Sequence, residues 1–238
     1  MLRRPPRSTL VPYTTLFRSS VRATTAQEIR HLAPDIDVIT VAGNVSDPQI
    51  QQALLDATPG ADILINNNGG PPFRDFRELD RKAMTEGVTM NMITPIEMIK
   101  GVIDDMSARG FGRIVNITSI SVKKPVLGLD LSSGARAGLT AFLAGVCRSV
   151  AHNNVTINNI LPGFFNTDRL QGSFKASASA LGITVEDAAE QRSAQIPAKR
   201  FGEPEEFGEA CAFLCSNQAG YITGQNLLLD GGVFESAF

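Results

Sequence analysis

Two hydrophobic patterns alternate along the chain. Short runs of apolar residues, many of them β-branched, are separated by longer stretches in which apolar residues recur every three or four positions. The short runs are typical of buried parallel strands, and the periodic stretches are typical of amphipathic helices. The short runs predict strands at 35–42, 63–65, 114–117, 155–161 and 225–229.

The periodic stretches predict helices between these strands. Asp47-Pro48 is typical of a helix start, and Gly110 stands where a C-cap glycine belongs. The connection 164–197 carries its own apolar side chains, and a connection of that length is usually a functional lid. Helices are expected at 20–32, 47–59, 79–109, 130–152 and from Pro204 onward.

Strands that alternate with helices predict an α/β fold, with one doubly wound parallel sheet, helices on both faces and a single domain. Ligands of such sheets bind beyond the carboxyl ends of the strands. The residues that follow the predicted strands are small or polar, as a ligand that approaches the backbone requires. They are Asn44, Asn66 to Gly70, Thr118-Ser119 and Pro162-Gly163.

Composition narrows the range of partners. The 238 residues carry a formal net charge of −2 and no long block of like charges, so neither nucleic acid nor a membrane is expected as a partner. The three cysteines lack metal-ligand spacing, and no metal is expected. Cys211 and Cys215 lie four apart in an apolar helical pattern, which predicts buried helix positions. Small molecules and copies of the chain remain as partners, with the cytoplasm as the expected location.

Residues 1–19 differ from the rest of the chain. They contain four arginines and three prolines but no acidic residue and no glycine. Such a composition is typical either of a transit peptide or of a segment foreign to the domain, and we favour the second interpretation. The expected organisation is therefore a foreign or disordered leader at 1–19 and one domain at 20–238.

Five motifs follow one another along residues 20–238: Asn66-Asn67-Asn68-Gly69, then Asn91, Ile117-Thr118-Ser119, Pro162-Gly163-x3-Thr167 and Tyr221-Ile222-Thr223-Gly224-Gln225, which ends in Asp230-Gly231-Gly232. In order and spacing they resemble the motifs of the short-chain dehydrogenase/reductase family, most of all its 3-oxoacyl-[acyl-carrier-protein] reductases. The resemblance implies a Rossmann-like fold, NADP or NAD as cofactor, a ketone or 3-oxoacyl substrate, and a homo-dimer or homo-tetramer.

The resemblance also implies roles for individual residues. Ser119 would bind the carbonyl oxygen of the substrate, and Asn91 would hold a water. The residues implied in cofactor binding are Asn44, Val45, Asn67, Asn68, Gly69, Pro162, Gly163 and Thr167.

One departure from the family concerns the proton donor. The family places Tyr-x3-Lys thirteen residues after the serine, whereas this chain has Ser132 and Arg136 there. A serine is a poorer acid than a phenol, and an arginine stays protonated. Ser132 and Arg136 are candidates for the catalytic pair, but Ser132 is also typical of a helix N-cap and Arg136 of a surface ion pair. Lys123 or Lys124 is an alternative source of the positive charge that the family's lysine supplies.

A second departure lies at the N-terminus. The first glycine is Gly43, so the glycine-rich turn that holds the cofactor's phosphates is not found. The resemblance implies that the first strand–helix–strand unit is missing, which would leave a gap of about 10 Å in the sheet. We expect Leu10–Phe17 to fill an empty strand position, and weak or no dinucleotide binding by this chain.

Two classes of function remain at this point. The first is an NAD(P)-dependent oxidoreductase, favoured by Ser119, Asn91 and the Pro162–Thr167 motif. The second is a non-catalytic relative that binds a nucleotide or acyl ligand or serves as an oligomer partner, favoured by the absent tyrosine.

Overall fold

The computed structural model describes residues 9–10, 13–14 and 19–236. Its centre is a parallel sheet in the order β1-β3-β4-β5-β6, and β2 also pairs with β3. The strands are β1 (Thr9–Leu10), β2 (Tyr13–Thr14), β3 (Ile63–Asn68), β4 (Gly112–Ile117), β5 (Val155–Pro162) and β6 (Asn226–Leu229). The predicted parallel α/β sheet is therefore confirmed, and the predicted strands at 63–65, 114–117, 155–161 and 225–229 are found.

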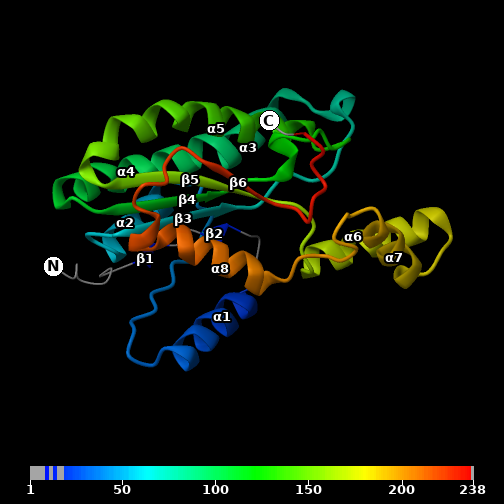
Figure 1. Ribbon diagram of the computed structural model, residues 1–238, viewed down its shortest axis with the longest axis horizontal. Coiled ribbons are helices and arrows are strands. Elements are labelled where there is room, and N and C mark those ends of the chain that lie inside the picture. Colours follow the sequence, from blue (N-terminus) through cyan, green and yellow to red (C-terminus); the bar gives the residue numbers. More distant parts are fainter. Residues whose placement is uncertain (1–8, 11–12, 15–18, 237–238) are drawn as a thin grey trace.

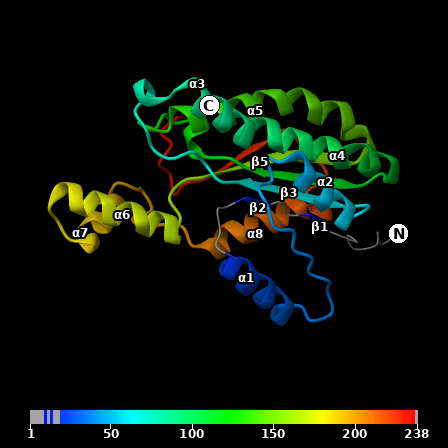
Figure 2. The same cartoon turned by 180° about the vertical axis from the view of Figure 1, so that it is seen from behind.

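Helices cover both faces of the sheet (Figure 1). The helices α3 (Arg81–Val88), α4 (Thr94–Arg109) and α5 (Asp130–Val150) lie on one face, and α2 (Pro48–Ala57) packs beside α4. The other face carries α8 (Pro204–Cys215), with α1 (Ser19–Leu32) beyond it (Figure 2). Each face buries its own apolar core, one against α4 and α5 and one against α8.

The strand predicted at 35–42 is wrong. This segment forms no regular structure, and Ile36 and Ile39 are exposed. A strand requires a neighbour, and β1 and β2 pair with the outer edge of β3 instead. The predicted gap in the sheet therefore does not arise among the described residues.

The short strands β1 and β2 test the expectation that Leu10–Phe17 fills an empty strand position. Leu10 aligns with Leu64, and Tyr13 and Thr14 align with Asn67 and Asn68. The expectation that Leu10–Phe17 fills a strand position is confirmed for these residues, whereas 11–12 and 15–17 lie outside the described part of the chain. Whether 1–19 is foreign to the domain stays a prediction.

The helix predicted at 79–109 is divided. A π-helical turn, Thr89–Ile93, separates α3 from α4. Pro95 has no N–H to donate to the carbonyl of Asn91, so a regular helical hydrogen bond cannot form there. The turn places Asn91 in the interior of the protein, and the predicted C-cap at Gly110 is confirmed by its left-handed φ of 69°.

The connection 164–197 is helical rather than a loop. It forms α6 (Asp168–Leu181) and α7 (Val185–Ala194), which project from one end of the sheet (Figure 1). The two helices share a small apolar cluster around Phe174, Ala178 and Ala188. The lid role of this helical pair stays a prediction.

Four asparagines form a ladder across the sheet. Asn66, Asn116, Asn159 and Asn226 lie opposite one another on β3, β4, β5 and β6. Each Nδ2 donates to the next Oδ1, over 2.9, 3.1 and 2.8 Å in turn. The first three side chains are buried, so their hydrogen bonds replace the water that they lose on folding.

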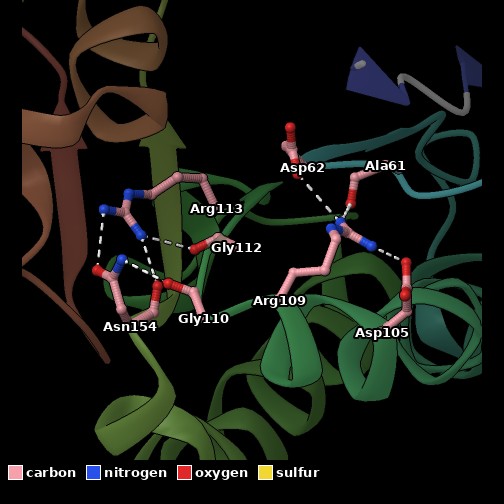
Figure 3. Close-up of polar contacts among 8 residues, drawn as sticks. All are labelled: Ala61, Asp62, Asp105, Arg109, Gly110, Gly112, Arg113 and Asn154. Carbon is pink, nitrogen blue, oxygen red and sulfur yellow. Dashed lines mark hydrogen bonds and ion pairs between the residues drawn. The ribbon is translucent and has the colours of Figure 1, made fainter. Parts of the chain in front are cut away.

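Two arginines tie together the amino ends of the strands (Figure 3). Arg113 is only 1% exposed and donates to the carbonyls of Gly112, Asn154 and Ser216 at 2.8, 2.9 and 3.0 Å. Arg109 donates to the carbonyl of Ala61 at 2.8 Å and pairs with Asp62 and Asp105. These contacts fix the end of the sheet that lies opposite the polar strand ends.

The ladder makes a testable prediction about stability. Asn116→Ala removes the donor to Asn159 Oδ1 and the closer acceptor of Asn66 Nδ2, and should lower the free energy of unfolding by about 3 kcal/mol. Asn226→Ala, at the half-buried end of the ladder, should cost about 1 kcal/mol. Urea unfolding measures both values, and equal losses would contradict a cooperative ladder.

Candidate functional site

The candidate site lies at the carboxyl ends of β3, β4 and β5. Because these strands are parallel neighbours, their last residues meet at one edge of the sheet. The strands end at Asn68, Ile117 and Pro162, next to the polar residues singled out in the sequence.

Arg136 joins two of these strand ends. It comes from α5, is 7% exposed, and donates from Nη1 to the carbonyl of Ile117 at 2.8 Å and from Nη2 to the carbonyl of Asn68 at 3.0 Å. The surface ion pair considered for this residue is therefore wrong. The guanidinium instead binds the ends of β3 and β4, because its planar donors reach two carbonyls at once.

Ser132 lies one helical turn before Arg136. It is buried, and its Oγ accepts a hydrogen bond from Arg136 Nε at 3.3 Å. The helix begins at Asp130 with Leu129 as its cap, so the N-cap position predicted for Ser132 is wrong. Since the hydroxyl accepts from a cation, its own proton remains available for donation.

Ser119 follows β4 and is half-buried. Its Oγ accepts from the backbone N–H of Ser121 at 3.1 Å and so caps a short 3-10 turn, Ile120–Val122. Capping uses one lone pair of the hydroxyl and leaves its O–H as a donor. The capping role and a role in binding a substrate oxygen are therefore compatible.

Hydrogen bonds of Asn91 and Asn68 connect the end of β3 to the π-helical turn. Asn91 Nδ2 donates to the carbonyl of Gly69 at 3.0 Å, and Asn68 Nδ2 donates to the carbonyl of Met90 at 2.6 Å. Both side chains are buried, and their Oδ1 atoms have no hydrogen-bond partner among the described residues. Two buried acceptors therefore lie near the end of β3, whose last carbonyl Arg136 also binds.

Gly163 and Thr167 follow β5. Gly163 donates to the carbonyl of Leu229 at 2.8 Å, and a Cβ at this position would lie 2.8 Å from Asp230 Cα, so only glycine fits. Thr167 is exposed and caps α6 by accepting from the N–H of Leu170. Pro162 ends β5 and is half-buried.

The remaining candidates are more dispersed. Asn44 is exposed, and its side chain accepts from the N–H of Ser46 at 3.0 Å, which is a local turn contact. Val45 is buried in the core beside α4. Asn67 is half-buried and lies opposite Tyr13 of β2. These three residues thus lie in a surface turn, in the core and beside β2, whereas Arg136 binds the strand ends.

The two lysines after Ser119 hold the C-terminal segment. Lys124 Nζ donates to the carbonyl of Val233 at 2.8 Å and pairs with Glu235 at 3.5 Å. Lys123 Nζ lies 5.2 Å from the centre of the Phe234 ring. The structure therefore gives both lysines partners in the last residues of the chain, which the sequence pattern did not indicate.

A cavity of about 230 Å³ lies at the base of the α6–α7 pair, lined by residues that include Phe164, Phe201 and Asp230. At its rim Arg200 donates two hydrogen bonds of 2.7 Å to Glu206. The hydrogen bonds from Arg200 and from the N–H of Glu203 lower the pKa of Glu206 to about 2. The pair therefore stays ionised at neutral pH.

Comparisons with known proteins agree on one family. The family model described as "Enoyl-(Acyl carrier protein) reductase" matches residues 15–234. The acetoacetyl-CoA reductase of Cupriavidus necator is 34% identical over 83% of this chain and 77% of its own length. The 3-oxoacyl-[acyl-carrier-protein] reductase FabG of Vibrio cholerae is 31% identical over 82% and 77%.

Solved structures show the same likeness. YwfH, an NADPH-dependent reductase involved in bacilysin biosynthesis, matches with a TM-score of 0.85 at 30% identity, over 92% of this chain and 86% of its own. The actinorhodin polyketide ketoreductase with NADPH matches with a TM-score of 0.84 at 25% identity, over 92% and 85%.

The buried position of Arg136 makes a second prediction. Arg136→Leu leaves the carbonyls of Ile117 and Asn68 without this donor and should lower the free energy of unfolding by about 3 kcal/mol. Arg148→Leu, on the exposed side of the same helix, should change it by less than about 0.5 kcal/mol. Urea unfolding of both variants checks the difference, and similar small effects would show that the guanidinium does not hold the strand ends.

Proposed function

The chain belongs to the short-chain dehydrogenase/reductase family, and we propose that it reduces a ketone or a 3-oxoacyl group with NADP(H) or NAD(H) as cofactor. The relatives named above are reductases of such substrates, and the B. subtilis reductase BacG, 32% identical, is NADPH-dependent by name. The observation that carries the proposal is the position of Arg136, which contacts Ser132 and binds the carbonyls at the ends of β3 and β4. Ser119 follows β4, and Asn91 binds the carbonyl of Gly69 just after β3.

In the proposed reaction Ser119 donates a hydrogen bond to the carbonyl oxygen of the substrate. The reduced nicotinamide supplies the hydride when it is bound. As the carbonyl accepts it, negative charge grows on the oxygen, and a fixed hydroxyl donor stabilises that charge more than it stabilises the neutral ketone.

Ser132 is the proposed proton donor in place of the family's tyrosine. Its proton would pass to the substrate oxygen, and the hydrogen bond from Arg136 Nε would stabilise the alkoxide left on Ser132 Oγ. Arg136 stays protonated and cannot pass a proton onward, so the hydroxyl must be reprotonated from water. Because serine is a weak acid, we expect slower turnover than a tyrosine would give.

The chain fits one end of a dinucleotide better than the other. Asn68 Oδ1 and Asn91 Oδ1 are buried acceptors at the strand ends, which suits hydrogen-bond donors such as a carboxamide N–H or a ribose hydroxyl. The described residues ahead of α2 contain no glycine-rich turn at a helix start, since the first glycine is Gly43 and lies in a loop. The residues therefore do not fit the pyrophosphate.

A non-catalytic role is not favoured, because the relatives named above are all reductases. A homo-dimer or homo-tetramer and a cytoplasmic location stay predictions. Within the described residues, no helix has the length and apolar character needed to cross a bilayer.

The proposal is tested with two proteins. One is the chain as printed, and the other carries the N-terminal unit of a family relative, with its glycine-rich turn, in place of 1–19. We expect the second to oxidise NADPH in the presence of acetoacetyl-CoA or a simple ketone, and the first to bind NADPH more weakly by calorimetry. Ser119→Ala should lower the rate by about 10²-fold. If the second protein retains cofactor binding but turns over neither acetoacetyl-CoA nor any of a panel of simple ketones, the enzymatic function is refuted.

The role of Ser132 gives a further prediction. Ser132→Ala should lower kcat by about 10²-fold or more with little change in KM, because the substrate is still bound but the proton donor is lost. Ser133→Ala is the matched control, since the Ser133 hydroxyl donates to the carbonyl of Leu129, the cap of the same helix. Steady-state kinetics compare the two, and an unchanged kcat for Ser132→Ala would assign the proton to water.

A further inference from the structure

Two of the three cysteines lie together on α8. Cys211 and Cys215 are four residues apart, so they occupy the same side of adjacent helical turns. Each is 7% exposed and belongs to the apolar core between α8 and the sheet. The third cysteine, Cys147, lies on α5 across the sheet and is part of the other core.

A groove of about 390 Å³ borders this thiol pair. It runs between β3 and α8 and is lined by apolar residues that include Ile63, Ile65 and Phe207, together with both cysteines. Figure 1 shows α8 lying along the face of the sheet opposite α4 and α5. The groove borders Ile63 and Ile65 in the first half of β3, whereas Ser119 follows the carboxyl end of β4. The groove is therefore separate from the candidate site at Ser119.

The two thiols interact with each other. A hydrogen bond from the Cys215 thiol lowers the pKa of Cys211, and the same hydrogen bond, with burial, raises the pKa of Cys215. The nearby charge of Arg113 acts on Cys215 in the opposite direction. One thiolate is thus favoured while the second thiol keeps its proton, as is usual for interacting dithiols.

The helical spacing of the two cysteines is too wide for a direct disulfide but suits a bridge through a third atom. Residues at i and i+4 of a helix hold their Cβ atoms about 5–6 Å apart, whereas a disulfide requires about 3.5–4.5 Å. One atom placed between the two sulfurs relieves this mismatch. Among the described residues no group of three or more His, Cys, Asp or Glu side chains is placed to hold a metal, so a third protein ligand is not available.

We propose that Cys211 and Cys215 form a two-thiol site that binds a single soft, thiophilic centre, such as trivalent arsenic, in the groove between β3 and α8. Soft thiolate ligands prefer soft centres over hard cations such as magnesium. With phenylarsine oxide, two As–S bonds form while the oxide oxygen leaves as water with the two thiol protons. Arsenic stays trivalent, so no oxidant or reductant is needed.

The first test uses the unmodified full chain. Incubation with phenylarsine oxide, followed by intact-protein mass spectrometry, should show one adduct per chain. A dithiol such as 2,3-dimercaptopropanol should remove it, whereas the same concentration of a monothiol should not, because two As–S bonds must be exchanged together. No adduct, or removal by both reagents alike, would overturn the proposal.

Variants then locate the site. Cys211→Ser and Cys215→Ser should each abolish the dithiol-specific adduct, while Cys147→Ser should retain it. Cys211→Ala and Cys215→Ala serve as second variants if a buried hydroxyl impairs folding, and thermal unfolding verifies that each protein is folded. An adduct that survives the loss of Cys211 or Cys215, or that disappears with Cys147, would refute this assignment.

Discussion

The buried guanidinium of Arg136 is the constraint on which the candidate site depends. Its donors join the ends of β3 and β4 through the carbonyls of Asn68 and Ile117, and Nε contacts Ser132 on the same helix. Burying a cation is costly unless hydrogen bonds replace its hydration. The positions of α5 and of the two strand ends are therefore coupled, and the hydroxyl of Ser132 is oriented by the same group.

Local patterns were sufficient for much of the fold. The strands predicted at 63–65, 114–117 and 155–161 were found because each is a short apolar run, and most of their residues are buried in the sheet. The segment 35–42 has a similar pattern but forms no strand, since pairing depends on neighbours that the local sequence does not specify. The division of 79–109 follows from a single residue, Pro95, whose effect a helical periodicity hides.

The candidate site was predictable in place but not in detail. The motifs put Ser119 at a strand end, where parallel topology places ligands, and Asn91 in the helix predicted at 79–109. The sequence did not predict that Arg136 would be buried, because its partners are backbone carbonyls, which any residue carries. The helix predicted at 130–152 already contained Ser132, but the N-cap role considered for this residue was wrong, because the helix begins at Asp130 with Leu129 as its cap.

The asparagine ladder has a consequence for how the sheet assembles. Its three hydrogen bonds all run in one direction, so the orientation of each amide fixes that of the next. A slip of one residue between β5 and β6 would set Asn159 opposite Gln225 or Leu227 and break its 2.8 Å hydrogen bond to Asn226. The ladder thus favours the native strand register. Shifted registers can bury as much apolar surface, but they lose the hydrogen bonds between the asparagines.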